Sequence, residues 1–248
     1  MSQVVLITGG SRGIGAATAL LAAQKGWAVA VNYSSNSLAA DEVVRQIRQG
    51  GGTAITVQAD VAQENQVLAM FEKVDAKLGR LNALVNNAGV VDQRERVDGM
   101  SVARLKRMFD INVIGTMVCA REAVKRMSTR YGGTGGAIVN VSSVAARLGA
   151  PGQYVDYAAA KGAVDVFTLG LAREVAAEGI RVNAVRPGII ETEIHASGGL
   201  PDRAREMAPL VPMQRAGSAA EVAHSIVWLL GSDSSYTTGA LLDIAGGR

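Results

Sequence analysis

The chain has 248 residues, a formal net charge of +3, and 48% hydrophobic residues. This length suits one large α/β domain with a sizeable core, and the slight, evenly spread charge gives no indication of nucleic acid binding. A single cysteine excludes an intramolecular disulfide. The cysteine and the two histidines do not have the spacing of metal ligands, which argues against a transition-metal site. We expect Cys119, in an apolar run, to be a buried structural thiol.

The first residues lead almost directly into a β-branched run at 4–8. No basic-then-apolar leader precedes this run, and no apolar stretch reaches the about 18 residues that a membrane span needs. These features predict a soluble, cytoplasmic protein with no membrane partner.

Short β-branched segments then alternate with longer segments of helical periodicity. Apolar residues recur every three or four positions between Val67 and Leu78, and Ser218 with Glu221 forms a capping box before another apolar helix face. The strands are mostly continuous apolar runs, typical of a parallel sheet that helices cover on both faces. The predicted strands are 4–8, 28–33, 54–59, 81–86, 136–142, 180–186 and 240–244. The pattern predicts a doubly wound parallel sheet with helices on both faces, and residues 1–248 as one domain.

A glycine-rich turn, Thr8-Gly9-Gly10-Ser11-Arg12-Gly13-Ile14-Gly15, separates the first strand from an alanine-rich helix. Glycines permit a tight turn and close backbone approach, and the free N–H groups at a helix start can bind a pyrophosphate. The spacing differs from G-x-G-x-x-G, and no Gly-Lys-Ser/Thr follows, so this is not a Walker loop. An ordinary structural turn is the alternative, but the position between strand and helix favours a dinucleotide site.

This turn resembles that of the short-chain dehydrogenase/reductase family, and the resemblance continues along the whole chain. Five further motifs follow in the family's order: Asn86-Asn87-Ala88-Gly89, Asn112 before Gly115, Ser142-Ser143, Tyr157-x-x-x-Lys161 and Pro187-Gly188. The resemblance implies a seven-stranded Rossmann-type sheet and a homotetramer or homodimer. It also implies an NAD(P)-dependent enzyme that transfers a hydride between a nicotinamide and an alcohol or carbonyl.

Four residues are the candidate catalytic set: Asn112, Ser143, Tyr157 and Lys161. Tyr157 and Lys161 are four apart and share a helix face, so the ammonium is expected to lower the tyrosine pKa and let it exchange protons with substrate. Ser143 would hold the substrate oxygen. The resemblance implies that Lys161 also binds the nicotinamide ribose and that Asn112 anchors a water in a proton relay.

Two assignments in this set have alternatives. Ser143 precedes Tyr157 by fourteen residues, one more than is common in the family, with the extra residue expected in 153–156. Ser142 therefore remains a second candidate for the active-site serine. Tyr154 is a rival acid, but no lysine follows it by four residues.

The nucleotide preference is predicted from the second strand and the glycine turn. The strand ends in Asn32-Tyr33-Ser34-Ser35, and no acid follows until Asp41, whereas NAD-specific sites place an acid there on the ribose 2′-hydroxyl. Arg12 offers a fixed charge to a 2′-phosphate. NADP(H) is favoured, with NAD(H) as the alternative. The predicted cofactor-binding residues are Gly9, Ser11, Arg12, Gly13, Ile14, Gly15, Asn32, Tyr33, Ser34, Asp60, Val61, Asn87, Ala88, Gly89, Tyr157, Lys161, Pro187, Gly188, Ile190 and Thr192.

The substrate is less well encoded. Residues 189–212 resemble the family's substrate lid, in which His195 either touches substrate or lies exposed on a loop. A small alcohol or carbonyl, of sugar or polyol type, is the first hypothesis. A 3-oxoacyl-carrier-protein reductase is the second, with Arg130 and Arg173 docking an acyl carrier protein beside the cleft. A catalytically idle nucleotide-binding regulator is the third.

Two further expectations concern surfaces. The basic stretch from Arg94 to Arg107 is interpreted as a solvated loop and helix face. Small residues along 157–177 and the apolar C-terminal segment 240–245 favour close helix and subunit contacts, in agreement with a homotetramer.

Overall fold

The computed structural model describes residues 3–193, 198–200 and 202–248. Its main feature is a seven-stranded, entirely parallel sheet in the order β3-β2-β1-β4-β5-β6-β9. The strands are β1 Val4–Ile7, β2 Ala28–Tyr33, β3 Ala54–Gln58, β4 Leu81–Asn86, β5 Gly136–Val141, β6 Ile180–Pro187 and β9 Leu241–Ile244. A two-stranded sheet pairs β7 Ile190–Glu191 with β8 Gly217–Ser218. All seven predicted strands are present, with ends that differ by at most a few residues.

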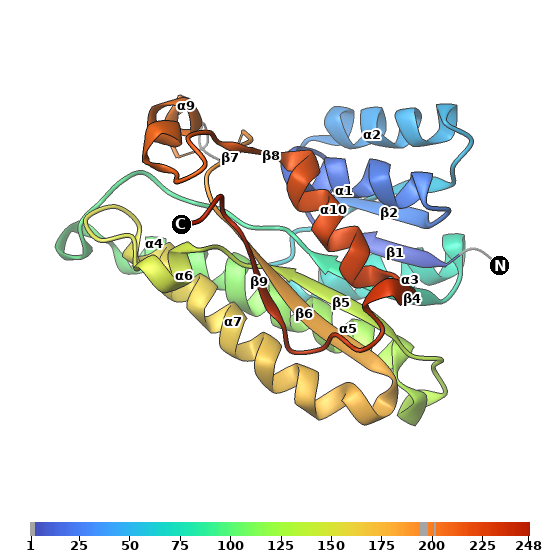
Figure 1. The fold of residues 1–248 in the computed structure, drawn as a ribbon. Coiled ribbons are helices and arrows are strands. Elements are labelled where there is room, and N and C mark those ends of the chain that lie inside the picture. Colours follow the sequence, from blue (N-terminus) through green and yellow to red (C-terminus); the bar gives the residue numbers. More distant parts are fainter. Residues whose placement is uncertain (1–2, 194–197, 201) are drawn as a thin grey trace.

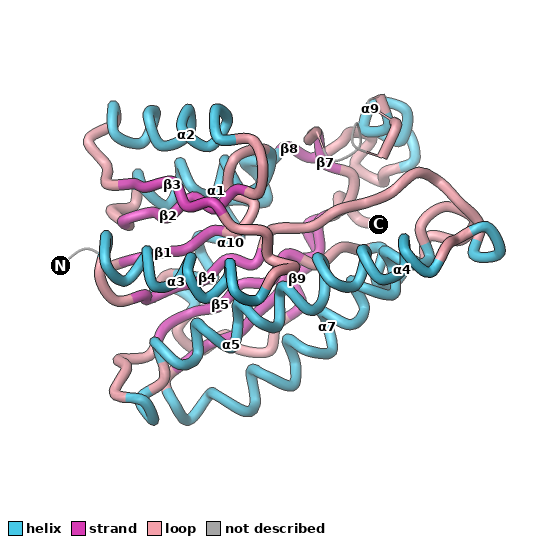
Figure 2. Tube along the Cα trace, turned by 180° about the vertical axis from the view of Figure 1, so that it is seen from behind, coloured by secondary structure: helices cyan, strands magenta, loops and turns pink. Residues whose placement is uncertain are grey.

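Helices cover both faces of the sheet, as Figures 1 and 2 show. One face packs against α1 Gly13–Gln24, α2 Ser37–Gln49 and α10 Ala219–Leu230. The other packs against α3 Glu64–Leu78, α5 Gly115–Met127 and α7 Val155–Val175. Because both faces are buried, the strands lack polar alternation; all four residues of β1 are buried. The predicted doubly wound Rossmann-type fold is confirmed.

Shorter elements surround the carboxyl ends of the strands. They include α4 Val102–Phe109, the π-helix η2 Asp110–Ile114, α6 Ala145–Leu148 and α9 Arg203–Met207. The 3-10 turns are η1 Val97–Gly99, η3 Thr129–Tyr131, η4 Ala176–Glu178, η5 Ala208–Leu210 and η6 Ser232–Ser234. In the described parts of the chain, no helix is long and apolar enough to cross a membrane.

The strand order fixes where a ligand can bind. The chain adds β2 and β3 on one side of β1 and then returns to place β4 on its other side, so Val5 pairs with both Val29 and Ala83. In such sheets the crevice for a ligand opens at the carboxyl ends of the strands that flank this reversal. Here those strands are β1 and β4.

Two local predictions are also confirmed. Ser218 and Glu221 form the reciprocal capping box at the start of α10. Cys119 is fully buried in the core, and burial raises the pKa of its thiol to about 12. It is therefore an inert structural thiol.

Candidate active site

A cavity of about 860 Å³ lies at the carboxyl ends of the strands. The turn after β1, the end of β2 and the loops after β3, β4, β5 and β6 all contribute to it. Of the predicted site residues, Gly15 and Asn112 do not line this cavity; the others do. Ile194, His195 and Pro201 lie outside the described residues.

The glycine turn leaves the start of α1 open. Gly9 and Gly13 have φ of 59° and 53°, a conformation that favours glycine. No side chain caps α1, so its first N–H groups lack a side-chain partner at the edge of the cavity, which Gly13 and Ile14 line. A Cβ on Gly15 would lie 2.4 Å from the Gly9 carbonyl oxygen. Gly15 does not line the cavity, but only glycine lets α1 pack this closely against the turn.

The loop after β4 is fastened to this turn. Thr8 Oγ1 accepts hydrogen bonds from the backbone N–H groups of Asn87 and Ala88, both at 3.0 Å. Asn87 Nδ2 donates to the carbonyls of Thr8 and Gly9 at 3.0 and 2.9 Å. The two loops that flank the crevice therefore form one rigid wall.

Asn32 supports the turn from below and does not offer its side chain to a ribose. It is 2% exposed; its Oδ1 accepts from Gly9 N at 3.0 Å, and its Nδ2 donates to the carbonyls of Val57 and Ala59 at 3.2 and 3.0 Å. The sequence had suggested Asn32 as a position that faces the nucleotide. Tyr33 and Ser34 line the cavity at the end of β2 without such fixed side-chain contacts to the turn.

Arg12 is exposed at the mouth of the cavity. It forms no ion pair with any residue in the described ranges. The residues at the end of β2, Tyr33 and Ser34, also include no acid. The guanidinium is thus available to an incoming anion. Thr192 borders the same turn, because a Cβ on Gly13 would lie 3.2 Å from Thr192 Cγ2.

Tyr157 lies in the first turn of α7 and shares a hydrogen bond with Ser143. The pKa of its hydroxyl is raised to about 12, because the raising effect of burial is larger than the lowering effect of the hydrogen bond with Ser143. The expected lowering of the Tyr157 pKa is therefore wrong, because the loss of solvent around the phenolate raises it. The hydroxyl keeps its proton at neutral pH.

Lys161 is 4% exposed, one turn along α7 from Tyr157. Its Nζ donates to the Val141 carbonyl at 2.7 Å and lies 5.6 Å from the centre of the Tyr157 ring. Burial lowers its pKa to about 8, against an opposing effect of Asp165. The lysine is therefore close to releasing its proton near neutral pH.

The two candidate serines have different environments. Ser142 is buried, and its hydroxyl donates to the Lys161 carbonyl at 3.1 Å. Ser143 is partly exposed, accepts from Ala145 N at 3.1 Å, and contacts the Tyr157 hydroxyl. The geometry favours Ser143 as the serine that reaches a ligand.

Asn112 is fully buried behind the cavity wall, in the π-helix between α4 and α5. Its amide donates to and accepts from the backbone of Val90, both at 3.1 Å. A Cβ on Gly89 would lie 2.8 Å from Asn112 Oδ1 and 3.5 Å from Lys161 Nζ. Asn112 therefore fixes the loop that packs against Lys161; π-helical insertions frequently occur at such sites.

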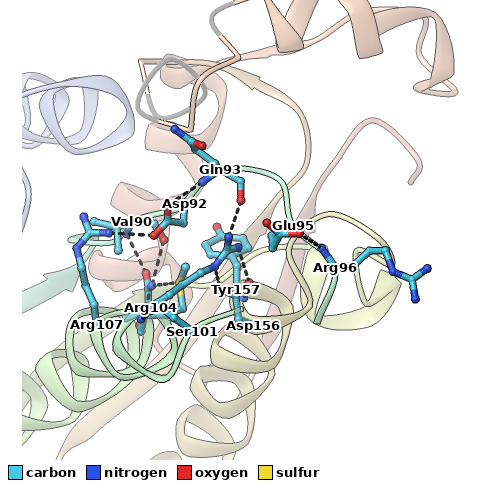
Figure 3. A network of polar contacts seen from close by, with 12 residues as sticks. Val90, Asp92, Gln93, Glu95, Arg96, Ser101, Arg104, Arg107, Asp156 and Tyr157 are labelled. Atoms are coloured by element: carbon cyan, nitrogen blue, oxygen red, sulfur yellow. Dashed lines mark hydrogen bonds and ion pairs between the residues drawn. The ribbon is translucent and has the colours of Figure 1, made fainter. Parts of the chain in front are cut away.

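A buried ion pair beside Tyr157 was not predicted. Arg104 lies in the basic stretch interpreted as solvated, yet its side chain is 11% exposed and pairs with fully buried Asp156 at 2.8 Å (Figure 3). Gln153 and Arg203 also line the cavity. The extra residue between Ser143 and Tyr157 indicated that segment 153–156 is unusual. No local sequence pattern, however, predicted that Asp156 pairs with Arg104 or that Gln153 and Arg203 line the cavity.

Comparisons with known proteins agree with this geometry. Residues 9–248 match the model of the family described as Enoyl-(Acyl carrier protein) reductase. The chain is 58% identical over 245 residues to the uncharacterized oxidoreductase YgfF of Escherichia coli K12, with 99% of both chains covered. The protein belongs to the short-chain dehydrogenase/reductase family.

Other members of the family differ in what their names say they act on. A 3-oxoacyl-[acyl-carrier-protein] reductase of Synechocystis is 38% identical over 99% of this chain and 96% of its own. The crystal structure of acetoin dehydrogenase YohF from Salmonella typhimurium superposes with a TM-score of 0.88, at 34% identity, over 100% of this chain and 97% of that one. Membership makes the protein an oxidoreductase dependent on NAD(P)(H).

The residues present fit such a dinucleotide. The uncapped start of α1 and the open glycine turn suit a pyrophosphate, and the cavity continues to the Tyr157 hydroxyl. The bound nicotinamide would supply hydride transfer. The chain itself supplies a phenol, a hydroxyl and an amine that can hold an oxygen atom and move a proton.

Proposed function

We propose that the protein transfers a hydride between NADP(H) and a small alcohol or carbonyl substrate. The observation that carries this proposal is the meeting of Tyr157, Ser143 and Lys161 in the same cavity as the open glycine turn. In the direction of reduction, Ser143 holds the carbonyl oxygen and Tyr157 donates a proton to it. The raised pKa of Tyr157 keeps that proton on the hydroxyl until the oxygen gains negative charge.

Lys161 and Asn112 have supporting roles in this proposal. Lys161 stabilises negative charge on the Tyr157 oxygen and binds the nicotinamide ribose. Its pKa of about 8 suits exchange of a proton with Tyr157 near neutral pH. Asn112 holds the loop at Val90 and, in this proposal, anchors a water in the proton relay to Lys161.

The preference for NADP(H) rests on Arg12 and on the end of β2. A 2′-phosphate carries nearly two negative charges, and the cavity offers it an unpaired guanidinium and, at Tyr33 and Ser34, hydroxyl groups in place of a carboxylate. An NAD site would need an acid at this strand end. The described residues of the segment 189–212 belong to the substrate lid in this proposal, and Ile189, Ala204 and Val211 form a small apolar core there.

The second candidate function is reduction of a 3-oxoacyl group on a carrier protein, which the name of the Synechocystis relative favours. The docking residues expected for it do not support it within one protomer. Arg130 lies in η3 before the amino end of β5, and Arg173 lies in the last turn of α7. Both residues thus lie near the amino ends of the strands, whereas the cavity lies at the carboxyl ends. An idle nucleotide-binding regulator is disfavoured by the complete catalytic set.

A homotetramer is part of the proposal. Val166 of α7 is 71% exposed, and Ile114 and Met117 near the start of α5 are 50% and 37% exposed. A Cβ on Gly162 or Gly170 of α7 would meet no atom within 4 Å, so packing within the protomer does not require glycine there. A second copy of the chain would bury this apolar, small-residue face.

The test is oxidation of NADPH and NADH by the purified protein with a panel of carbonyl compounds. The panel contains ketoses, small diketones, cyclic ketones and a 3-oxoacyl thioester. Faster NADPH oxidation with a small carbonyl than with the thioester supports the proposal. Preference for the thioester selects the second candidate function, and no turnover with any carbonyl refutes both.

A further inference from the structure

Two buried polar atoms at one end of the cavity have no hydrogen-bond partner among the described residues. They are Arg203 Nη1, from α9, and Gln153 Oε1, from the loop before α7. Both residues line the cavity that contains Tyr157. Buried polar groups are almost always hydrogen-bonded, so each atom calls for a partner that the described residues do not supply.

The neighbours of Arg203 hold its guanidinium in place without neutralising it. The guanidinium carbon lies 5.2 Å from the centre of the Tyr154 ring, a cation–π contact. Asp202 pairs with the exposed Arg205 at 3.1 Å. Glu206, also exposed, attracts Arg203 electrostatically but forms no ion pair with it in the described structure.

Burial is the largest effect on the pKa of Arg203 and lowers it. Tyr154 and Glu206 raise this pKa electrostatically, whereas Arg94 and Arg248 lower it, and Arg248 lines the cavity. An arginine stays protonated in proteins, so its burial costs free energy that an anion would recover.

This end of the cavity is distinct from the phosphate end. Arg203 stacks on Tyr154, at the start of α7, whereas Arg12 and the glycine turn follow β1. Figure 1 shows α9 at the upper left, above the C-terminus, and α2 at the upper right of the molecule. Arg203 thus lies at the end of the cavity away from the expected adenosine half of the nucleotide, beside the segment that carries Tyr157.

We propose that Arg203 is a specificity residue that binds a carboxylate on the carbonyl substrate, while Gln153 accepts a hydrogen bond from a substrate hydroxyl. This inference rests on the proposed function, because it names the substrate class of the same cavity. The preferred substrates are oxo-carboxylates and their hydroxy-acid products. Neutral carbonyl compounds of the same skeleton bind less well, since they leave the guanidinium without an acceptor.

The test compares oxo-carboxylates with their methyl esters, in linear and cyclic skeletons, by NADPH oxidation. For at least one skeleton, kcat/KM for the acid exceeds that for the ester by about 10- to 100-fold. Arg203→Gln removes this preference by lowering kcat/KM for the acid and not for the ester, and Arg203→Lys retains part of it. Arg205→Gln, on the exposed side of the same helix, changes neither value. NADPH affinity is unchanged in all three variants.

The inference is overturned if no acid is preferred to its ester, or if Arg203→Gln lowers acid and ester equally. A binding measurement separates it from the proposed function. Calorimetry with the NADP⁺-loaded protein is expected to show binding of benzoate, weaker binding of benzamide, and loss of the difference in Arg203→Gln. If no carbonyl is reduced and this difference persists, the proposed function fails and the anion site stands. If benzoate and benzamide bind alike, the anion site fails.

Discussion

The carboxylate of Asp156 accepts two hydrogen bonds from the guanidinium of Arg104, from Nε at 2.8 Å and from Nη2 at 3.3 Å (Figure 3). Arg104 Nη1 also donates to the Gln93 carbonyl at 2.8 Å, and Asp156 accepts from Tyr157 N at 2.9 Å. One buried ion pair thus connects α4, the loop after β4 and the first turn of α7. It fixes the backbone that carries the candidate proton donor.

Loss of the arginine from this pair should destabilise the protein severely. Arg104→Met leaves the buried Asp156 carboxylate without a counter-charge, which should lower the free energy of unfolding by about 3–5 kcal/mol. The double variant Arg104→Met/Asp156→Asn should recover part of the loss. Denaturant unfolding measures both. A loss below about 1 kcal/mol in Arg104→Met, the magnitude of an exposed pair, would show that the pair is solvated.

The lowered pKa of Lys161 should make stability depend on pH. The folded-state pKa is about 8, against an ordinary value of 10.5. Between these values the unfolded chain holds a proton that the folded chain has released, so the free energy of unfolding rises with pH; below pH 8 both states are protonated and the contribution is constant. The rise approaches about 1.4 kcal/mol per pH unit.

The comparison that isolates this effect is wild type against Lys161→Met, by denaturant unfolding between pH 8 and pH 10. Tyr157, whose pKa is raised from 10.0 to about 12, opposes the trend only above that window. Cys119, whose pKa is raised from 9.0 to about 12, opposes the trend above pH 9 but does so equally in both proteins. The free energy of unfolding of wild type relative to Lys161→Met should therefore rise with pH. Equal slopes in the two proteins would mean that Lys161 is not desolvated.

Nucleotide choice should respond to Arg12 and Tyr33. Arg12→Ala removes a charge-assisted hydrogen bond and should weaken NADPH binding by about 10- to 150-fold, with little effect on NADH. Tyr33→Asp places a carboxylate at the end of β2 and should shift preference toward NADH. The measurement is kcat/KM for both nucleotides. An equal loss for NADPH and NADH in Arg12→Ala would remove the basis for the NADP assignment.

The fold could be predicted from the sequence because its signals are local. Most strands are continuous apolar runs, and α3 and α10 repeat apolar residues at helical spacing, so a parallel sheet covered by helices satisfies both patterns. The glycine turn could also be predicted from the sequence, because the close packing of Gly15 against Gly9 requires glycine at a position next to the first strand. These features do not depend on distant partners.

The details of the site depend on such partners and were harder to predict. Asn32 lies next to the end of β2, where a nucleotide contact is common, yet its amide is used by Gly9, Val57 and Ala59. The pKa of Tyr157 was expected to fall because Lys161 is near in sequence, but burial, a property of the whole fold, raises it. Arg104 looked like a surface residue until Asp156, far along the chain, was placed beside it.

The apolar face of α7 should mediate assembly. Val166→Arg puts a charge on a side chain that is 71% exposed in the protomer, so it should not disturb the core but should shift a homotetramer to smaller species. Light scattering after size exclusion, together with circular dichroism, measures assembly and folding. A wild-type monomer at micromolar concentration would contradict the proposed oligomer, and an unchanged mass in Val166→Arg would exclude this face.

Hydride transfer in Tyr157→Phe tests the central claim most directly. A single turnover with bound NADPH and a carbonyl substrate, followed by nicotinamide absorbance, measures transfer without product release. Loss of the hydroxyl should lower the rate by about 10²- to 10⁴-fold and leave NADPH affinity nearly intact, because the ring and Lys161 remain. Tyr154→Phe should have little effect. A rate in Tyr157→Phe above about one tenth of the wild-type rate, or a larger loss in Tyr154→Phe, would contradict the account.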